Sequence, residues 1–211
     1  MDLSAPTEPL LQGGTSAVLG VLAGTSAGLT GRTVARLAGL SHAGAGKVLT
    51  QLVEHGMVLA EPVGAANAYR LNREHLLVGP ALEMLHALDR LETQLGTAIR
   101  SWPVRCAGCA LFGSAARRDG TTRSDLDVLV LRPDLIAVDD PAWRAQLDDT
   151  ASQVECWTGN PLSWVEFDTA TFTRMITGSD PLIGELRRDA HWLIAAAPPV
   201  RTALAIPARS A

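Results

Sequence analysis

The sequence predicts an α+β protein in which a helical N-terminal part and a strand-containing C-terminal part are joined by one long helix. Three observations support this prediction. The N-terminal third shows helical periodicity and then two short apolar runs typical of a hairpin. A stripe of leucines at helical spacing follows, and beyond Pro103 strand-length apolar runs alternate with helical segments. With 211 residues, the chain can bury one good core or two small ones.

These patterns divide the chain into five expected segments. They are a flexible arm (1–14), a helical domain with a hairpin (15–75), a linker helix (76–102), a domain with strands and helices (103–197) and a Pro-rich tail (198–211). No apolar run approaches the length of a membrane span and the start lacks a basic signal region, so we expect a cytoplasmic protein. Arginine dominates the basic residues, with Lys47 the only lysine, which indicates a GC-rich bacterial source.

The helical domain is expected to contain three helices. The first runs from Thr15 to about Leu22 and the second from Arg32 to Ala38. The third is capped by Ser41 and ends at Gly56, where a left-handed residue is favoured. Its buried stripe consists of Ala45, Val48, Leu49, Leu52 and Val53. The apolar runs Met57–Ala60 and Ala68–Leu71 follow and predict a hairpin.

This order of elements resembles the winged helix-turn-helix of small MarR- and ArsR-type bacterial regulators. The resemblance implies that the third helix enters the major groove of DNA. The residues expected to contact DNA are Ser41, His42, Gly44, Lys47, Thr50 and Gln51 on this helix, Arg32 and Arg36 before it, and Arg70 in the wing. The net charge of −4 leaves few cations for phosphate contacts. A surface that only docks a partner or the neighbouring domain is therefore the alternative.

The linker is predicted as one amphipathic helix from Leu77 to Ile99. Its apolar stripe consists of Ala81, Leu85, Leu88, Leu91, Leu95 and Ile99. Such a stripe fits a homodimer formed through the helix, or equally packing against the two domains of the same chain. Trp102–Pro103 ends the helix, because the residue before a proline is disfavoured in helical geometry.

The C-terminal domain is expected to form a small sheet with helices on one side. Its predicted strands are Val104–Phe112, Asp125–Leu131 and Leu162–Phe167. The predicted helices are a short segment carrying Arg117 and Arg118, Pro141–Cys156, and a last one from Asp180–Pro181 to Ala190. His191–Ala196 is read as a strand or a helix end. Cys106 and Cys109 form a CxxC without a second pair, so they are expected to be core residues rather than metal or redox ligands.

The segment from Gly113 to Leu131 carries the clearest chemical signal. Gly113–Ser114 follows an apolar strand, ten polar and small residues come next, and Asp125 and Asp127 open the next strand. Alternate residues of a strand share a face, so the two carboxylates are expected to lie about 7 Å apart on one side. Such a pair favours a hard divalent cation, Mg²⁺ or Mn²⁺. The glycine turn lets backbone amides approach a phosphate.

Together, the Gly-Ser turn, its spacing and the Asp-apolar-Asp strand resemble the DNA polymerase β-like nucleotidyltransferases, and most closely the minimal ones. The resemblance covers about residues 103–195. It implies a Mg²⁺-dependent transfer of a nucleoside monophosphate from an NTP, expected to be ATP, to a hydroxyl of a protein or RNA. Asp125 and Asp127 would hold the metal. Gly113, Ser114, Arg117 and Arg123 would bind the nucleotide.

Members of this family usually supply a third carboxylate from the following strand. Glu166 is the preferred candidate because it shares a strand face with Leu162 and Trp164 in mid-strand. It would then act as a metal ligand or as a base. Asp168 is the competitor, although it is also placed to cap the segment after it.

Three function classes follow from these resemblances. The first is an active nucleotidyltransferase with a DNA-binding or docking domain; minimal family members include antitoxins that transfer AMP to a toxin. The second is a DNA-binding transcriptional regulator whose transferase domain only senses nucleotide. The third, an antibiotic-modifying transferase, is disfavoured because no sizeable helical substrate domain follows the predicted sheet.

Overall fold

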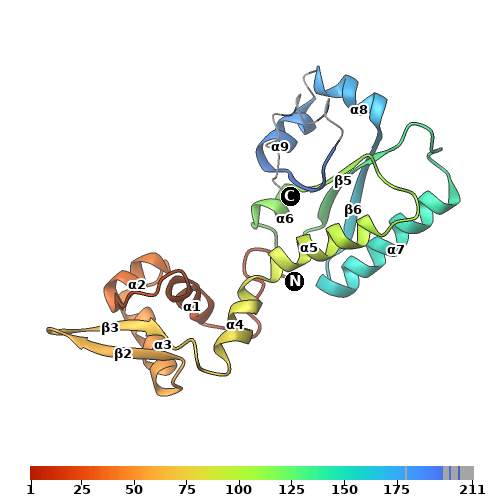
Figure 1. Ribbon diagram of the computed structural model, residues 1–211. Helices are drawn as coiled ribbons and strands as arrows, with labels where there is room; N and C mark the ends of the chain where they lie inside the picture. Colours follow the sequence, from red (N-terminus) through yellow and green to blue (C-terminus); the bar gives the residue numbers. More distant parts are fainter. Residues whose placement is uncertain (179, 197–199, 201–203, 205–211) are drawn as a thin grey trace. The chain divides into compact units, whose positions relative to one another are not determined.

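The computed structural model of the chain describes residues 1–178, 180–196, 200 and 204. It divides into two compact units, which are Ala5–Leu88 and Met1–Ser4 with Asp89–Ala211. We call them the helical unit and the sheet unit and describe each by itself (Figure 1). The α+β class predicted from the sequence is confirmed, since helices and two separate sheets make up the described chain.

The helical unit contains the predicted helices and hairpin. Its elements are α1 (Thr15–Ala23), β1 (Leu29–Thr30), α2 (Gly31–Leu37), α3 (His42–Glu54), β2 (Val58–Val63), β3 (Ala66–Leu71) and α4 (Val78–Leu85). The strands form an antiparallel sheet in the order β1-β3-β2. The sequence did not predict β1, because two residues are too few to show alternation.

Local chemistry explains where these elements begin and turn. The Ser41 hydroxyl accepts a hydrogen bond from the Gly44 amide (3.0 Å) and so caps α3. Gly64 has a φ of +62°, which allows a tight turn. Strand pairing therefore continues to Val63 and Ala66, beyond the shorter strands expected from the apolar runs.

The predicted linker helix is divided at His86. α4 ends at Leu85, and α5 (Ala87–Arg100) begins after the break. Val78 and Ala81 of α4 are buried in the core of the helical unit. The prediction of one continuous helix was wrong. The spacing of the apolar residues is the same on both sides of His86, and no glycine or proline in the sequence indicates a break there.

The sheet unit follows, with the predicted strands and helices and one additional helix, α8. Its elements after α5 are β4 (Gly108–Phe112), α6 (Gly113–Arg117), β5 (Leu126–Arg132), α7 (Pro141–Thr158), β6 (Leu162–Asp168), α8 (Thr169–Ile176), α9 (Pro181–Asp189) and β7 (His191–Ile194). The strand order is β6-β5-β4-β7. β4 pairs antiparallel with β5 and β7, whereas β5 and β6 are parallel and are connected through α7.

Helices cover both faces of this sheet, which corrects the expectation of helices on one side. On one face, Leu129 of β5 lies in a core with Phe172 of α8 and Ile183 of α9. On the other face, Trp102 packs against Trp143 of α7 and against Trp164 of β6. The ring centroids are 5.7 Å apart in the first pair and 5.8 Å apart in the second. β5 requires both layers because its apolar side chains are buried on both sides. We call these the α8/α9 face and the α7 face.

The first residues do not form the flexible arm that was expected. The amides of Leu3 and Ser4 both donate to the Gly120 carbonyl (2.9 and 3.0 Å), and the Leu3 side chain is fully buried. Burial of an apolar side chain holds this segment in the sheet unit. The predicted tail lies outside the described residues except for Val200 and Leu204. Among the described residues, no helix is long and apolar enough to cross a membrane.

Candidate active site

The two aspartates of the motif lie at the start of β5, on the α8/α9 face. Asp127 pairs with Phe112 of β4 and with Ser163 of β6. Asp125 stands one residue before the strand, and its Oδ2 accepts a hydrogen bond from the Ser163 hydroxyl (2.9 Å). Ser163 and Asp127 are register partners and share a face, so this bond places both carboxylates on the same side of the sheet.

The Gly-Ser turn lies directly against Asp127. Gly113 begins α6 with a φ of +66°, and a Cβ built on it would lie 2.5 Å from the Asp127 Oδ2 atom. Both the backbone conformation and the missing side chain are therefore needed here. The structure thus brings the turn and one metal-ligand candidate into contact, as the motif predicts.

Replacing Gly113 with alanine should consequently disturb the site more than the fold. We expect a loss of about 1–3 kcal/mol in stability from backbone strain, together with at least about tenfold weaker Mg²⁺–ATP binding because the Asp127 carboxylate must move. Calorimetric titration and thermal unfolding would measure the two effects. Gly46→Ala is the control, since it lies mid-helix with no atom within 4 Å of its added Cβ. Equal ATP affinity in Gly113→Ala and wild type would contradict the prediction.

Burial and, to a smaller extent, neighbouring negative charges raise the pKa of Asp127. The largest cause is burial of the carboxylate, followed by the negative charges of Asp125 and Glu185; the Arg117 charge opposes them. A bound cation would stabilise the ionised form against exactly this repulsion. The electrostatics therefore favour a divalent cation at Asp127.

The residues present fit a magnesium ion. Asp125 and Asp127 supply hard oxygen donors, and Mg²⁺ is commonly held by one or two carboxylates together with substrate phosphates. Within the described part of the chain, no group of three or more His, Cys, Asp or Glu side chains is arranged to hold a metal. A cation held here would therefore have a carboxylate pair as its protein ligands rather than a closed cage.

The loop between the turn and the aspartates is fixed by a residue that the motif did not indicate. Asn160, fully buried after α7, donates through Nδ2 to the carbonyls of Thr121 and Ser124 (3.3 and 3.0 Å). The Leu126 amide in turn donates to the Pro161 carbonyl (2.9 Å). Asn160 therefore positions the segment that leads into Asp125. Its sequence context, Gly-Asn-Pro, is typical of a turn and does not by itself indicate this role.

The arginines of the motif differ in their surroundings. Arg117 is exposed and forms two ion pairs, one with Asp119 and one with Asp189 of α9 (3.0 Å each). Arg118 pairs with Asp89 of α5. Arg123 lies exposed in the loop. Arg117 thus links α6 to α9 beside Asp127, whereas a nucleotide-binding role for Arg117 and Arg123 remains a prediction.

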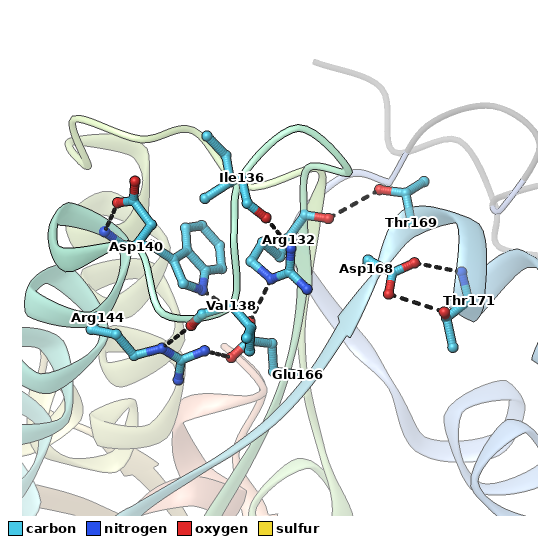
Figure 2. Close-up of polar contacts among 10 residues, drawn as sticks. Arg132, Ile136, Val138, Asp140, Arg144, Glu166, Asp168, Thr169 and Thr171 are labelled. Atoms are coloured by element: carbon cyan, nitrogen blue, oxygen red, sulfur yellow. Dashed lines mark hydrogen bonds and ion pairs between the residues drawn. The ribbon is translucent and has the colours of Figure 1, made fainter.

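The structure places Glu166 on the opposite face of the sheet from the aspartate pair. In the parallel register Ser163 pairs with Asp127 and Glu166 with Val130, so Glu166 lies on the α7 face. Its carboxylate accepts from Arg132 Nε (2.8 Å), Trp143 Nε1 (3.1 Å) and Arg144 Nη2 (2.5 Å). Figure 2 shows Glu166 between the two arginines. The prediction of Glu166 as a third carboxylate of the site was wrong, because its oxygens accept hydrogen bonds from side chains of α7 and of the end of β5.

Asp168, the competing candidate, is hydrogen-bonded at the start of α8 instead of facing the aspartate pair. Its carboxylate accepts from the Thr171 amide and hydroxyl (2.7 and 3.0 Å) and caps α8, as Figure 2 shows. These bonds lower the pKa of Asp168. The structure therefore brings neither predicted third carboxylate to the Asp125–Asp127 pair.

The residues expected to contact DNA lie mostly on the open side of α3. Ser41, His42, Lys47, Thr50 and Gln51 are exposed. Arg70 of β3 is exposed but binds Glu61 of the neighbouring strand (3.0 Å), so a phosphate contact would compete with this pair. Contact of these residues with DNA stays a prediction.

The stripe of the linker packs within its own chain, and Cys109 of the CxxC is buried whereas Cys106 is partly buried. Ala81, Leu91, Leu95 and Ile99 are buried within the chain, as packing against the same chain predicts, and a homodimer through the helix stays a prediction. Burial raises the pKa of the Cys109 thiol, as expected for a core cysteine. The described cysteines form no disulfide.

Comparison with known proteins finds a limited structural likeness. No protein-family model and no curated protein matches the chain. A solved toxin–antitoxin structure with AMP-PNP is similar at 16% identity and a TM-score of 0.36, covering 55% of this chain and 85% of that chain. A mutant of the toxin–antitoxin MntA-HpeT is similar at 15% identity and a TM-score of 0.35, covering 55% and 84%. These values are too low to assign the chain to a family.

Proposed function

We propose that the sheet unit is a Mg²⁺-dependent nucleotidyltransferase that moves a nucleoside monophosphate from an NTP, expected to be ATP, to a hydroxyl acceptor on a protein or RNA. One observation carries the proposal: Gly113 lies against Asp127, with no space for a Cβ between the turn and the carboxylate. A phosphate-binding turn in contact with a cation-binding pair is the arrangement that an NTP–Mg²⁺ complex needs.

Each part of the site then has a defined task. Asp125 and Asp127 hold the cation, and the Ser163 hydroxyl fixes the orientation of Asp125 through its 2.9 Å hydrogen bond. The Gly113 amide and the Ser114 hydroxyl orient the phosphates. Arg117 adds positive charge beside Asp127. When bound, Mg²⁺ neutralises charge on the triphosphate and activates the α-phosphorus for displacement of pyrophosphate.

The direct experiment incubates the full chain with each α-labelled NTP and Mg²⁺, with and without the product of the adjacent gene. We expect label transfer that depends on Mg²⁺ and is lost in EDTA. Equilibrium binding of the same nucleotides would be measured in parallel. Absence of both transfer and Mg²⁺-dependent nucleotide binding would refute the proposed function.

A second candidate function is a transcriptional regulator whose sheet unit only senses nucleotide. One observation favours it: β6 supplies Ser163, not an acid, opposite Asp127. A site for binding alone needs no base. Binding of Mg²⁺–ATP without turnover under any condition would favour this function over transfer.

The helical unit is proposed to bind DNA through α3 in either case. Lys47→Ala should then weaken binding to an upstream palindrome and reduce the salt dependence by about one phosphate equivalent, because one exposed cation is lost. Fluorescence anisotropy across a salt series measures both quantities. Arg73→Ala is the control, because Arg73 is a cation outside α3. Its Nη2 atom donates a hydrogen bond to the Ala23 carbonyl (2.8 Å). If the wild type binds no promoter fragment at low salt, a docking role replaces DNA binding.

A further inference from the structure

Gly120, in the loop between the Gly-Ser turn and Asp125, is buried where separate segments of the chain meet. A Cβ built on Gly120 would lie 2.8 Å from Leu3 Cδ1 and 2.9 Å from Ser114 Oγ. Close packing therefore leaves no room for a side chain at this position unless Leu3 or Ser114 moves. Leu3, near the start of the chain, and the serine of the Gly-Ser turn thus both pack around the Gly120 Cα atom.

Leu3 is held in place by both its side chain and its backbone. The side chain is fully buried, and the Leu3 amide donates to the Gly120 carbonyl (2.9 Å). The Met1 nitrogen donates to Asn160 Oδ1 (2.5 Å), and the Asn160 Nδ2 atom binds two carbonyls of the same loop. Because burial of the Leu3 side chain stabilises this arrangement, the first residues form a fixed surface against which Gly120 packs.

Ser114 is the nucleotide-binding candidate whose side chain Gly120 approaches. It directly follows Gly113, whose missing Cβ allows the turn to lie against Asp127. The Ser114 side chain is only partly buried, so it is accessible to a ligand. A hydroxyl that orients a phosphate must be held close to one geometry. The close approach of Gly120 restricts the Ser114 hydroxyl to fewer orientations.

The loop from Gly120 to Asp125 connects the same contact to the aspartate pair. The Thr121 amide donates to Ser124 Oγ (2.9 Å), and the Ser124 amide donates to the Thr121 carbonyl (3.1 Å). These reciprocal bonds form a compact turn directly before Asp125. Because the residues between them are held together in this way, a shift of Gly120 also displaces the backbone at Asp125.

We propose that Leu3 is a positioning residue of the nucleotide site. Its buried side chain holds Gly120 against the Gly-Ser turn and so sets the orientation of the Ser114 hydroxyl and the position of Asp125. Leu3 acts through Gly120 and does not itself contact the nucleotide or the metal. This inference rests on the proposed function, because it assigns Leu3 a part in the binding of Mg²⁺–ATP.

The test uses the full-length chain and compares wild type with Leu3→Ala, Leu3→Met, Gly120→Ala, the double variant Leu3→Ala/Gly120→Ala and the control Leu131→Ala. Leu131 is as fully buried as Leu3 but lies at the end of β5 away from Asp127. Calorimetry measures the affinity for Mg²⁺ with an ATP analogue that is not cleaved between the α- and β-phosphates. Thermal unfolding without nucleotide measures stability.

We expect Leu3→Ala to weaken binding of the analogue by about tenfold or more, because small misplacements of positioning groups are costly. Leu3→Met conserves the side-chain volume and should stay within about twofold of wild type. Leu131→Ala should lose stability as Leu3→Ala does, since each leaves a cavity, but it should keep its affinity. Gly120→Ala should also weaken binding, and by a smaller factor in the Leu3→Ala background, where its Cβ no longer meets the Leu3 side chain.

Unchanged affinity in Leu3→Ala overturns the inference, as does an equal loss in Leu131→Ala, which would make the loss an effect of lower stability alone. Additive effects of the Leu3 and Gly120 substitutions also overturn it, because they would show that the two residues act separately. If Leu3→Ala does not fold, Leu3→Val takes its place with the same expected direction. A wild type that does not bind Mg²⁺ with the analogue refutes the proposed function itself, so the two failures are distinguishable.

Discussion

Replacing Asp127 with asparagine should lower NTP turnover by at least about 10²–10³-fold, because the amide removes the charge that holds the cation at the Gly-Ser turn. Asp125→Asn should have a similar effect, since both carboxylates are needed as ligands. The measurement is label transfer or pyrophosphate release at saturating ATP. Asp139→Asn, an exposed loop acid, serves as the control. Wild-type turnover in either site variant would exclude the proposed metal site.

The same Asp127 variant should be more stable than wild type without Mg²⁺. Burial and the neighbouring acids raise the pKa of Asp127, so the folded state favours the protonated form. The associated stability is present below the ordinary aspartate pKa and is lost as the pH rises through the raised value. At neutral pH, Asp127→Asn removes this penalty and should raise Tm, which thermal unfolding without Mg²⁺ would measure. Mg²⁺ should then stabilise wild type and have little effect on the variant.

Glu166→Gln should lower the free energy of unfolding by about 2–4 kcal/mol and leave Mg²⁺–ATP affinity unchanged. The Glu166 and Arg132 side chains are only 14% and 12% exposed, so the substitution leaves a largely buried guanidinium without its counterion. It also removes the charge-assisted bond from Arg144, which holds the start of α7. Denaturant unfolding and nucleotide titration measure the two effects.

Glu155→Gln provides the control for this prediction, because it makes the same substitution at an exposed glutamate of α7. Its stability should stay within about 0.5 kcal/mol of wild type. A Glu166→Gln variant that keeps its stability but loses turnover would restore Glu166 to the reaction. It would also contradict the placement of Glu166 on the face of the sheet opposite the aspartate pair.

The sequence could predict the aspartate pair because the pair is a local feature. Asp125 and Asp127 are two residues apart, and the alternation of one strand is enough to place them together. Gly113 is separated from them by a short loop whose ends lie on paired strands. No long-range information is needed for this part of the site.

Glu166 was misassigned because its face depends on the register between β5 and β6. That register is fixed through α7 and cannot be read from either strand by itself. A shift of one residue would move every side chain of β6 to the other face. The same argument explains why Ser163 was missed, because it became important only through its pairing with Asp127.

The hydrogen bonds of Leu3 and Ser4 connect the first residues of the chain to the loop that precedes Asp125. Because residues 1–4 belong to the sheet unit and residues 5–88 do not, the helical unit is an insertion connected at both of its ends. The Gly120 carbonyl, which accepts from Leu3 and Ser4, anchors one connection within the loop that precedes Asp125. The first residues of the chain therefore brace the backbone beside the candidate active site.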